Sequence, residues 1–288
     1  MPSKGLRLTT LPSALSSALP FAPMSAEPVE AVASVAPPVV GRVGAGRVGT
    51  VREAAGQRPS LVRLPGCYPV QADTWLLADT MRDLGLVSGA SVLDLCTGTG
   101  VLAVTAANAG AARVTAVDIS VRSAANAWLN AKRHNAAVRV LRGDLFAALA
   151  PGEQFDLVVS NPPYVPSRTA RLPRHTVNRC WDGGLDGRLL LDRICTESFD
   201  RVRPGGSLLL VHSTVAGDTR SIERLEESGF DVEVVRRARE PFGPVMRSRA
   251  TAMRSRGLIG EGQAHEELVV IRATRVETHG HSRIGSSS

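Results

Sequence analysis

The chain has 288 residues, of which 43% are hydrophobic and only 4% aromatic, so it can bury a large core made mainly of Leu, Val and Ala. Its formal net charge of +7 makes the chain basic, and a basic patch can attract nucleic acid or the ribosome. The four cysteines form no C-x-x-C pair, which argues against a zinc finger or a disulfide framework and predicts reduced thiols in a cytoplasmic protein without a metal. No apolar run reaches the roughly 18 residues of a membrane helix.

The first 60 residues are rich in Ala, Pro, Val, Ser and Gly and show no sustained helix or strand period. This composition predicts a disordered tail. Three alternatives stay open for it: a signal peptide in which Lys4 and Arg7 precede a Leu-rich stretch, an organellar transit peptide, and a true start at Met24.

Residues 61 to 276 are predicted to form one domain, followed by a flexible tail over residues 277 to 288. Helices are expected at Gln71–Leu84, Gly100–Ala109, Ser120–Asn135, Gly187–Arg201 and Asp218–Ser228, and a further helix is open over Gly243–Gly257. Strands are expected at Ser91–Leu95, Arg113–Asp118, Val138–Arg142, Phe155–Ser160, Gly206–His212, Asp231–Arg237 and Glu267–Ala273. Such alternation predicts an α/β fold with a mostly parallel sheet.

A glycine-rich turn follows the first expected strand, in the sequence Asp94-Leu-Cys-Thr-Gly-Thr-Gly100. Gly98 and Gly100 permit a positive φ and a close approach of a ligand to the backbone. Dinucleotide enzymes and plain strand-to-helix turns use similar sequences. Here the third glycine of the dinucleotide fingerprint is missing, and the acid Asp94 suits a cationic ligand better than a pyrophosphate.

Two further acids stand where the next two strands end. Asp118 comes 20 residues after Gly98 and is placed to accept both hydroxyls of a ribose, although it can also cap the following helix. Asp144 is placed to accept a hydrogen from an adenine amino group, or it is an ordinary turn aspartate. The ends of parallel strands share one edge of a sheet, so these groups are expected to meet there. S-adenosylmethionine, with a sulfonium, an amino acid, a ribose and an adenine, fits the set.

The fourth expected strand ends in Asn161-Pro162-Pro163-Tyr164. Two prolines end the strand and leave the Pro162 carbonyl without a ladder partner, beside the side-chain carbonyl of Asn161. These two oxygens can accept both hydrogens of a planar NH2 group, and Tyr164 can lie against its plane. The tetrad therefore predicts a holder for an amide or a base amine that receives a methyl group.

Together these motifs resemble class I S-adenosylmethionine-dependent methyltransferases, and within them the HemK family of protein glutamine methyltransferases. Two segments narrow the resemblance to the short eukaryotic and archaeal type: Tyr68-Pro-Val-Gln-Ala-Asp-Thr-Trp-Leu-Leu77 and Trp181-Asp-Gly-Gly-Leu-Asp-Gly-Arg188. The resemblance implies a seven-stranded, mostly parallel, Rossmann-like sheet with helices on both faces and an antiparallel last strand.

The resemblance also assigns roles. By this resemblance, the cofactor would contact two groups of residues. One group consists of Thr74, which stands beside Asp73, and of Asp94, Asp118, Asp144, Leu145 and Asn161. The other consists of the turn residues Cys96, Gly98 and Gly100. Asn161, the Pro162 carbonyl, Pro163 and Tyr164 would hold the substrate nitrogen, with Asn161, Pro162 and Tyr164 acting in catalysis. Cys96 departs from the glycine that short-type proteins often have there.

The expected acceptor is a glutamine of a translation release factor or another translation protein, and a small activator subunit is an expected partner. The tetrad alone also fits an RNA or DNA methyltransferase acting on an exocyclic base amine. Seven arginines between Arg236 and Arg256 form a basic run that either attracts RNA or the ribosome or is a solvated helix face. A non-catalytic binding module is the third reading, and the intact donor and acceptor residues argue against it.

Overall fold

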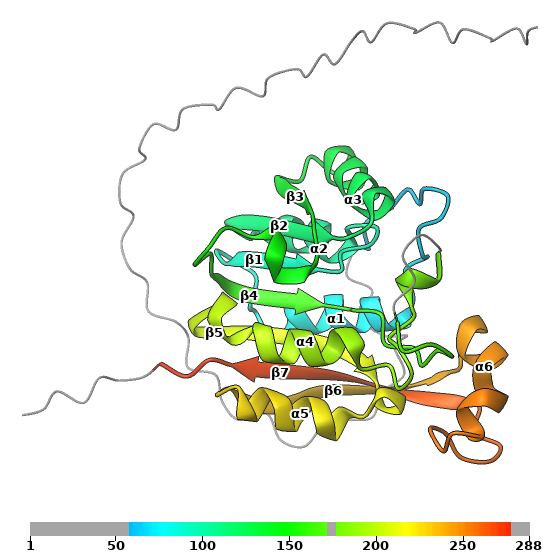
Figure 1. Cartoon of the computed structure of the whole chain (residues 1–288). Coiled ribbons are helices and arrows are strands. Elements are labelled where there is room, and N and C mark those ends of the chain that lie inside the picture. Colours follow the sequence, from blue (N-terminus) through cyan, green and yellow to red (C-terminus); the bar gives the residue numbers. More distant parts are fainter. Residues whose placement is uncertain (1–57, 172–176, 278–288) are drawn as a thin grey trace, which may run out of the picture. The chain divides into compact units, whose positions relative to one another are not determined.

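The computed structural model describes residues 58–171 and 177–277, and its centre is a seven-stranded sheet with the order β3-β2-β1-β4-β5-β7-β6 (Figure 1). The strands are β1 (Ser91–Leu95), β2 (Arg113–Asp118), β3 (Val138–Arg142), β4 (Phe155–Ser160), β5 (Val202–Ser213), β6 (Asp231–Pro241) and β7 (His265–Thr274). Neighbouring strands from β3 to β5 are parallel, whereas β7 is antiparallel to both β5 and β6. The expected α/β fold with an antiparallel last strand is confirmed.

The middle of the sheet is buried on both faces. All five residues of β1 and the whole second half of β5 are buried, as expected for central strands that are covered on both faces. The two edge strands, β3 and β6, are instead only partly buried. Burial thus decreases from the centre of the sheet to its edges, which explains why the central strands could be recognised from their composition alone.

Helices cover both faces of the sheet, with α1 behind it and α4 and α5 in front of it in the view of Figure 1. The helices are α1 (Ala72–Asp83), α2 (Val101–Asn108), α3 (Val121–Arg133), α4 (Leu189–Glu197), α5 (Asp218–Glu227) and α6 (Pro244–Arg254). The open question over Gly243–Gly257 is therefore answered by α6, which has Pro244 in its first turn, where a missing N–H costs nothing.

The largest differences from the expected bounds are found in three elements. The helix expected over Gly187–Arg201 begins two residues later, because Gly187 has a φ of +84°, and continues after α4 as a short 3-10 helix, Phe199–Arg201. β5 begins at Val202 and β6 extends to Pro241, since pairing with β4 and β7 continues beyond the apolar stretches.

The predicted N-terminal tail lies outside the described residues except for positions 58 to 60, and the predicted C-terminal tail lies outside them except for position 277. The Ser60 carbonyl oxygen lies 2.9 Å from the His134 ring nitrogen Nε2 at the end of α3, so the described fold reaches slightly into the expected tail. Within the described parts of the chain, no helix combines the length and the apolar character that crossing a membrane would need.

Candidate active site

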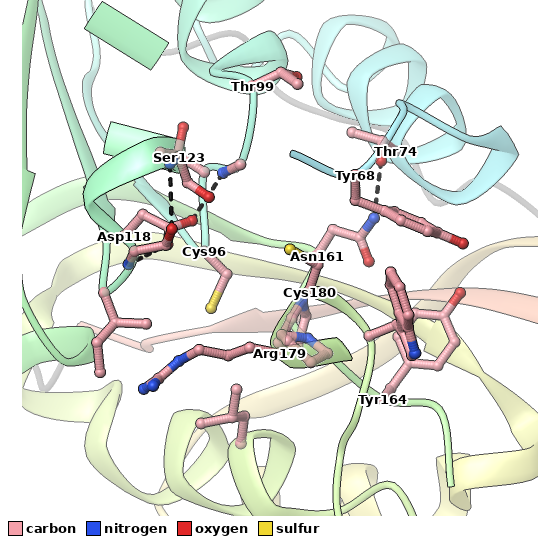
Figure 2. Close-up of a pocket in the computed structure, with 18 of the residues that line it drawn as sticks. Tyr68, Thr74, Cys96, Thr99, Asp118, Ser123, Asn161, Tyr164, Arg179 and Cys180 are labelled. Carbon is pink, nitrogen blue, oxygen red and sulfur yellow. Dashed lines mark hydrogen bonds between the residues drawn. The ribbon is translucent and has the colours of Figure 1, made fainter. Parts of the chain in front are cut away.

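A cavity of about 810 Å³ lies at the sheet edge where β1, β2, β3 and β4 end. This is the edge at which open α/β sheets bind their ligands. Most of the predicted site residues line it together: Thr74, Cys96, Gly98, Asp118, Asp144, Leu145, Asn161, Pro162, Pro163 and Tyr164. Figure 2 shows several of these side chains around the cavity. Two predicted residues, Asp94 and Gly100, do not line it.

The glycine turn after β1 forms one wall. Cys96 has a φ of +60° and Gly98 a φ of +57°, so the chain turns sharply through two left-handed residues. An added Cβ at Gly98 would meet no atom closer than 3.9 Å, and its open Cα face leaves room for a ligand against the backbone. Burial raises the pKa of the Cys96 thiol, so Cys96 lines the cavity as a neutral group.

Asp94 and Gly100 lie outside the cavity and stabilise this turn through packing and hydrogen bonds. An added Cβ at Gly100 would lie 2.8 Å from the Ala127 Cα, so this glycine lets α2 approach α3 closely. The Asp94 Oδ2 accepts hydrogen bonds from the Thr97 hydroxyl (2.6 Å) and from the Ala103 amide (3.0 Å) in the first turn of α2. Asp94 thereby supplies the capping acceptor that Gly100, the N-cap of α2, lacks.

Asp94 is fully buried, and desolvation raises its pKa to about 7. Its Oδ1 has no hydrogen-bond partner among the described residues. The structure thus shows a supporting role for Asp94, and its direct contact with a cofactor stays a prediction.

Asp118, at the end of β2, faces the cavity with a fixed carboxylate. Its Oδ1 accepts the Ser120 amide (2.8 Å) and its Oδ2 accepts the Gly98 amide (3.0 Å). The N-cap of α3 is Ser120, whose own hydroxyl accepts the Ser123 amide, so Asp118 is not the cap. Each Asp118 oxygen keeps lone pairs for a ligand, which suits the two hydroxyls of a ribose. Burial raises the pKa of Asp118, and the two amides oppose that rise.

The end of β3 completes the same wall. Asp144 is half exposed, and its carboxylate is paired with the Arg193 guanidinium at 3.0 Å. Leu145 has a φ of +47°, a rare value for a residue with a side chain, and turns the chain into a short 3-10 helix, Leu145–Ala148. The two residues therefore lie beside Asp118, at the place the sequence predicts for the adenine of a cofactor.

The Asn161 side chain has a defined orientation. Its Nδ2 donates to the Thr74 hydroxyl oxygen over 2.9 Å, drawn as a dashed line in Figure 2. The Thr74 hydroxyl in turn donates to the Asp73 Oδ1 (3.2 Å), which also accepts the Thr74 amide. A carboxylate can only accept, so this chain places the amide nitrogen of Asn161 toward Thr74. No donor from residues 58–171 or 177–277 bonds the Asn161 Oδ1 or the Pro162 carbonyl.

Tyr164 is anchored at both ends. Its hydroxyl donates to the Asp73 Oδ2 over 2.9 Å, so the pair Asp73-Thr74 holds both Asn161 and Tyr164. Its backbone is packed against Gly187, where an added Cβ would lie 2.1 Å from the Tyr164 carbonyl oxygen. Only glycine fits at position 187, which gives the Gly-Gly-x-x-Gly sequence a direct structural role in placing Tyr164.

The loop that starts at Trp181 pairs with the residues after the tetrad. The Val165 amide donates to the Trp181 carbonyl (2.8 Å) and the Gly183 amide donates to the Val165 carbonyl (2.9 Å). The Trp181 ring packs against the Tyr68 ring with centroids 5.1 Å apart. The two segments that carry the family resemblance, around Tyr68 and Trp181, therefore form one end of the cavity.

Arg188, at the other end of this loop, is buried and hydrogen-bonded. Its side chain is 3% exposed, and its guanidinium bonds Asp192, the Ala216 and Gly217 carbonyls and the Ser221 hydroxyl. A buried guanidinium with this many acceptors is well compensated, and its removal would leave them unpaired. Arg188 thus fixes the loop onto the segment between β5 and α5.

The arginine run is largely engaged within the chain. Arg249 bonds the Pro166 carbonyl (2.9 Å) and Asp182, and Arg256 bonds the Ser167 and Leu185 carbonyls. Arg236 and Arg237 pair with acids of other elements, and Arg247 bonds the Phe242 carbonyl. Within the described residues, only the Arg239 and Arg254 side chains of this run have no hydrogen-bond or ion-pair partner.

The cavity has many lining residues that the sequence analysis did not name, and three of them carry groups that bear on its chemistry: Arg179, Cys180 and Glu266. Arg179 and Cys180 are labelled beside the cavity in Figure 2, and the charge of Arg179 acts on Asp118. Glu266 lies at the start of β7. An antiparallel strand begins at the edge where its parallel neighbours end, so the direction of β7 was the signal that could have pointed to Glu266.

Comparison with known proteins agrees with this geometry. Residues 67–176 match the family model described as Methyltransferase small domain. A Methanocaldococcus jannaschii protein, named for N5-glutamine methyltransferase activity, is 32% identical over 63% of this chain and 90% of its own length. The Bordetella pertussis release factor glutamine methyltransferase is 39% identical over 49% of this chain, which spans only 54% of that relative.

Two solved structures share the fold. The complex of Encephalitozoon cuniculi Mtq2 and Trm112, responsible for methylation of the termination factor eRF1, matches with a TM-score of 0.51 and 24% identity over 73% of this chain and 99% of that chain. The Thermus thermophilus 16S rRNA methyltransferase RsmC, in complex with AdoMet and guanosine, matches with a TM-score of 0.51 and 22% identity over 74% of this chain and 46% of that chain.

S-adenosylmethionine is the cofactor that these findings indicate. The residues present fit it: the open Gly98 face, the free lone pairs of Asp118 and the half-exposed Asp144 line one continuous wall of the cavity.

Proposed function

We propose that this chain, which belongs to the HemK family of protein N5-glutamine methyltransferases, methylates the side-chain amide nitrogen of a glutamine in a protein. The observation that carries the proposal is the orientation of Asn161. Its nitrogen is bonded to Thr74, and its oxygen, like the Pro162 carbonyl, is left to accept a hydrogen from a ligand. Within residues 58–171 and 177–277, two unused acceptors therefore stand side by side here, and such a pair matches an NH2 group.

The reaction depends on how Asn161 and Pro162 bind a poor nucleophile. An amide nitrogen is weakly nucleophilic because its lone pair is delocalised into the carbonyl group. Acceptance of its two hydrogens by Asn161 and Pro162 fixes the nitrogen and becomes stronger as positive charge develops there. When bound, S-adenosylmethionine supplies an electrophilic methyl group on a positively charged sulfur. The substrate nitrogen would take up this methyl group, with the electron pair of the S–C bond left on the cofactor, while the Asn161 Oδ1 and the Pro162 carbonyl hold its two hydrogens. One N–H proton would then pass to water.

The substrate is proposed to be a translation protein, such as a release factor. Relatives named for release factor and ribosomal protein uL3 glutamine methylation support this choice. The chain spans about half the length of the Bordetella pertussis relative, so contacts outside the shared region are not carried over. Such a substrate supports the expected location in the cytoplasm.

A small activator subunit is the proposed partner. The Encephalitozoon cuniculi Mtq2 structure contains Trm112, and that neighbour is matched over 99% of its chain. In this chain, Val121 and Trp128 of α3 are 58% and 53% exposed, and α3 packs against the edge strand β3 and its neighbour β2. Exposed apolar side chains next to an edge strand suit a protein partner, which would cover both.

The RNA or DNA alternative is not retained as a second candidate. It was supported by the tetrad, which fits an amide as well as a base amine, and by the arginine run, in which five of the seven arginines bond groups of this same chain. Proximity to RNA or the ribosome stays a prediction that rests on Arg239 and Arg254.

The test is a transfer experiment with tritiated S-adenosylmethionine, the purified chain and a cell lysate, divided into nuclease-treated and protease-treated portions. Label that survives nuclease and is lost to protease is expected, with mass spectrometry of the labelled band placing one methyl group on glutamine. Label lost to nuclease would contradict the proposal. The same experiment with the activator subunit added tests the partner.

A further inference from the structure

Glu266 is a buried carboxyl at the acceptor end of the cavity. It is the second residue of β7, and it lines the cavity together with Tyr68, Tyr164 and Gly243. Glu266 is only 8% exposed. Glu267, the next residue, lies on the other face of the strand, where it pairs with Arg237 at 2.7 Å.

The charged neighbours of Glu266 are carboxyls. Glu240 of β6 stands directly opposite Glu266 in the antiparallel register, and Asp73 of α1 also acts on it. Two acids placed opposite each other repel when both are ionised. The uncharged groups facing it are the Ser213 hydroxyl of β5 and the phenols of Tyr68 and Tyr164. Burial, followed by Asp73 and Glu240, raises the pKa of Glu266 to about 7, although Ser213 opposes the rise.

Hydrogen bonding at this end is incomplete. The Tyr164 hydroxyl is used on Asp73, and the Gln71 amide nitrogen donates to the Tyr68 hydroxyl over 2.7 Å. The Glu266 Oε2 and the Trp181 Nε1, both buried, have no partner among the described residues. Unpaired buried polar atoms are costly in a folded protein, and a bound ligand is one way of pairing them.

We propose that Glu266, as a carboxylic acid, donates a hydrogen bond to the carbonyl oxygen of the acceptor amide and so makes the site select an amide over an amine. The inference rests on the proposed function and deepens it. An amide offers two hydrogens and one accepting oxygen, and Asn161 and Pro162 account only for the hydrogens. An amine has no oxygen for Glu266 to bond, and so it would leave that carboxyl unpaired.

The effect should fall on substrate binding. As the amide nitrogen takes up the methyl group, its lone pair is withdrawn from the carbonyl group and the oxygen becomes less negative. The Glu266 hydrogen bond is therefore no stronger in the transition state than in the bound substrate, and it changes KM more than kcat. Ionisation of Glu266 removes the donor and places a negative charge against the carbonyl oxygen.

The test uses two synthetic peptides that copy the sequence around the methylated residue found in the lysate experiment, one with Gln and one with Lys at the acceptor position. KM and kcat are measured from about pH 6 to about pH 8.5, across the titration of a group with a pKa near 7. The variants are Glu266→Gln, which is neutral and keeps a donor, and Glu266→Ala. Glu267→Gln is the matched control on the opposite face of β7.

For the unsubstituted protein, KM of the Gln peptide should rise about tenfold across this range at nearly constant kcat, which corresponds to the loss of one hydrogen bond. Glu266→Gln should have a low KM at every pH, Glu266→Ala a high KM at every pH, and Glu267→Gln the profile of the unsubstituted protein. The Lys peptide should be a poor acceptor near pH 6. Cofactor affinity should not change in either Glu266 variant.

Two results would overturn the inference: a Glu266→Gln variant that keeps the rise of KM with pH, or a Lys peptide methylated as well as its Gln twin near pH 6. Failure of the proposed function is distinct, since the lysate experiment would then show no methylated glutamine. If Glu266→Ala does not fold, Glu266→Gln alone still decides, because it changes only the charge and the pH response.

Discussion

The two ends of the cavity are built in different ways. The cofactor end consists of turns that directly follow three neighbouring strands, and its key group, Asp118, is held by the backbone amides of Gly98 and Ser120. The acceptor end joins segments far apart in the chain, since Asn161 and Tyr164 depend on Asp73 and Thr74 of α1 and on the Gly187 loop. The comparison teaches that the residues expected to bind the cofactor are placed by local sequence, whereas those expected to hold the acceptor depend on contacts between distant parts of the domain.

Asn161→Ala is the sharpest way to separate the two ends, and we expect the largest effect from it. Loss of one of the two acceptors for the substrate hydrogens should lower kcat roughly 10²- to 10³-fold. The dissociation constant of S-adenosylmethionine should stay nearly the same, because Asp118 and the glycine turn are untouched. Single-turnover methyl transfer and calorimetric titration measure the two quantities. Full turnover by this variant would remove Asn161 from the holder.

Gly187→Ala should disturb the packing of the acceptor end. A Cβ at this position would lie 2.1 Å from the Tyr164 carbonyl oxygen, and the residue has a φ of +84°, so we expect unfolding to become easier by about 3 kcal/mol or more. Gly152→Ala is the matched control, because its φ is +72° but no atom lies within 4 Å of the added Cβ. It should cost only about 1 kcal/mol. Chemical denaturation compares the two, and equal losses would show that backbone strain alone acts at Gly187.

Asp118→Ala addresses the cofactor end. Removal of its carboxylate takes away the ribose acceptor and also frees the Gly98 amide, so cofactor affinity should fall roughly 10- to 100-fold. At saturating cofactor, kcat should remain within a few-fold of its original value. Isothermal titration and steady-state assays provide the numbers. An unchanged affinity would mean that the cofactor does not use this wall of the cavity.

Arg256→Met should have the smallest effect. Arg256 holds the loops after Tyr164 and Trp181 through the Ser167 and Leu185 carbonyls, so its loss should raise the acceptor KM about threefold and leave cofactor binding unchanged. Arg254→Met is the control, since no described residue bonds that side chain. If both variants behave alike, the effect is one of net charge and not of loop position.

Much of the fold and of the cofactor end could be predicted from the sequence because their signals are local. The strand Ser91–Leu95 is fully buried and mostly apolar, Asp118 is the last residue of β2, and Asp144 follows β3. The predicted cofactor contact of Asp94 was harder to judge, since its carboxylate turns inward to cap α2, and no sequence pattern distinguishes an inward from an outward acid.

The acceptor end could be predicted only in part. The tetrad predicts that Asn161 is a holder, but the hydrogen bond that orients its side chain comes from Thr74 of α1, 87 residues away in the chain. Glu266 was missed because its function depends on the direction of β7 and on Glu240 across the sheet, which are properties of the tertiary structure. The arginine run was judged by its charge, whereas most of its members bond groups of the folded chain.

A crystal structure with S-adenosylhomocysteine and a glutamine peptide tests the central claim most directly. We expect the glutamine side-chain nitrogen to lie within hydrogen-bonding distance of both the Asn161 Oδ1 and the Pro162 carbonyl, while the Asn161 Nδ2 stays on Thr74. A glutamine amide bound elsewhere in the cavity, or an Asn161 side chain that turns its nitrogen toward the peptide, would contradict the account.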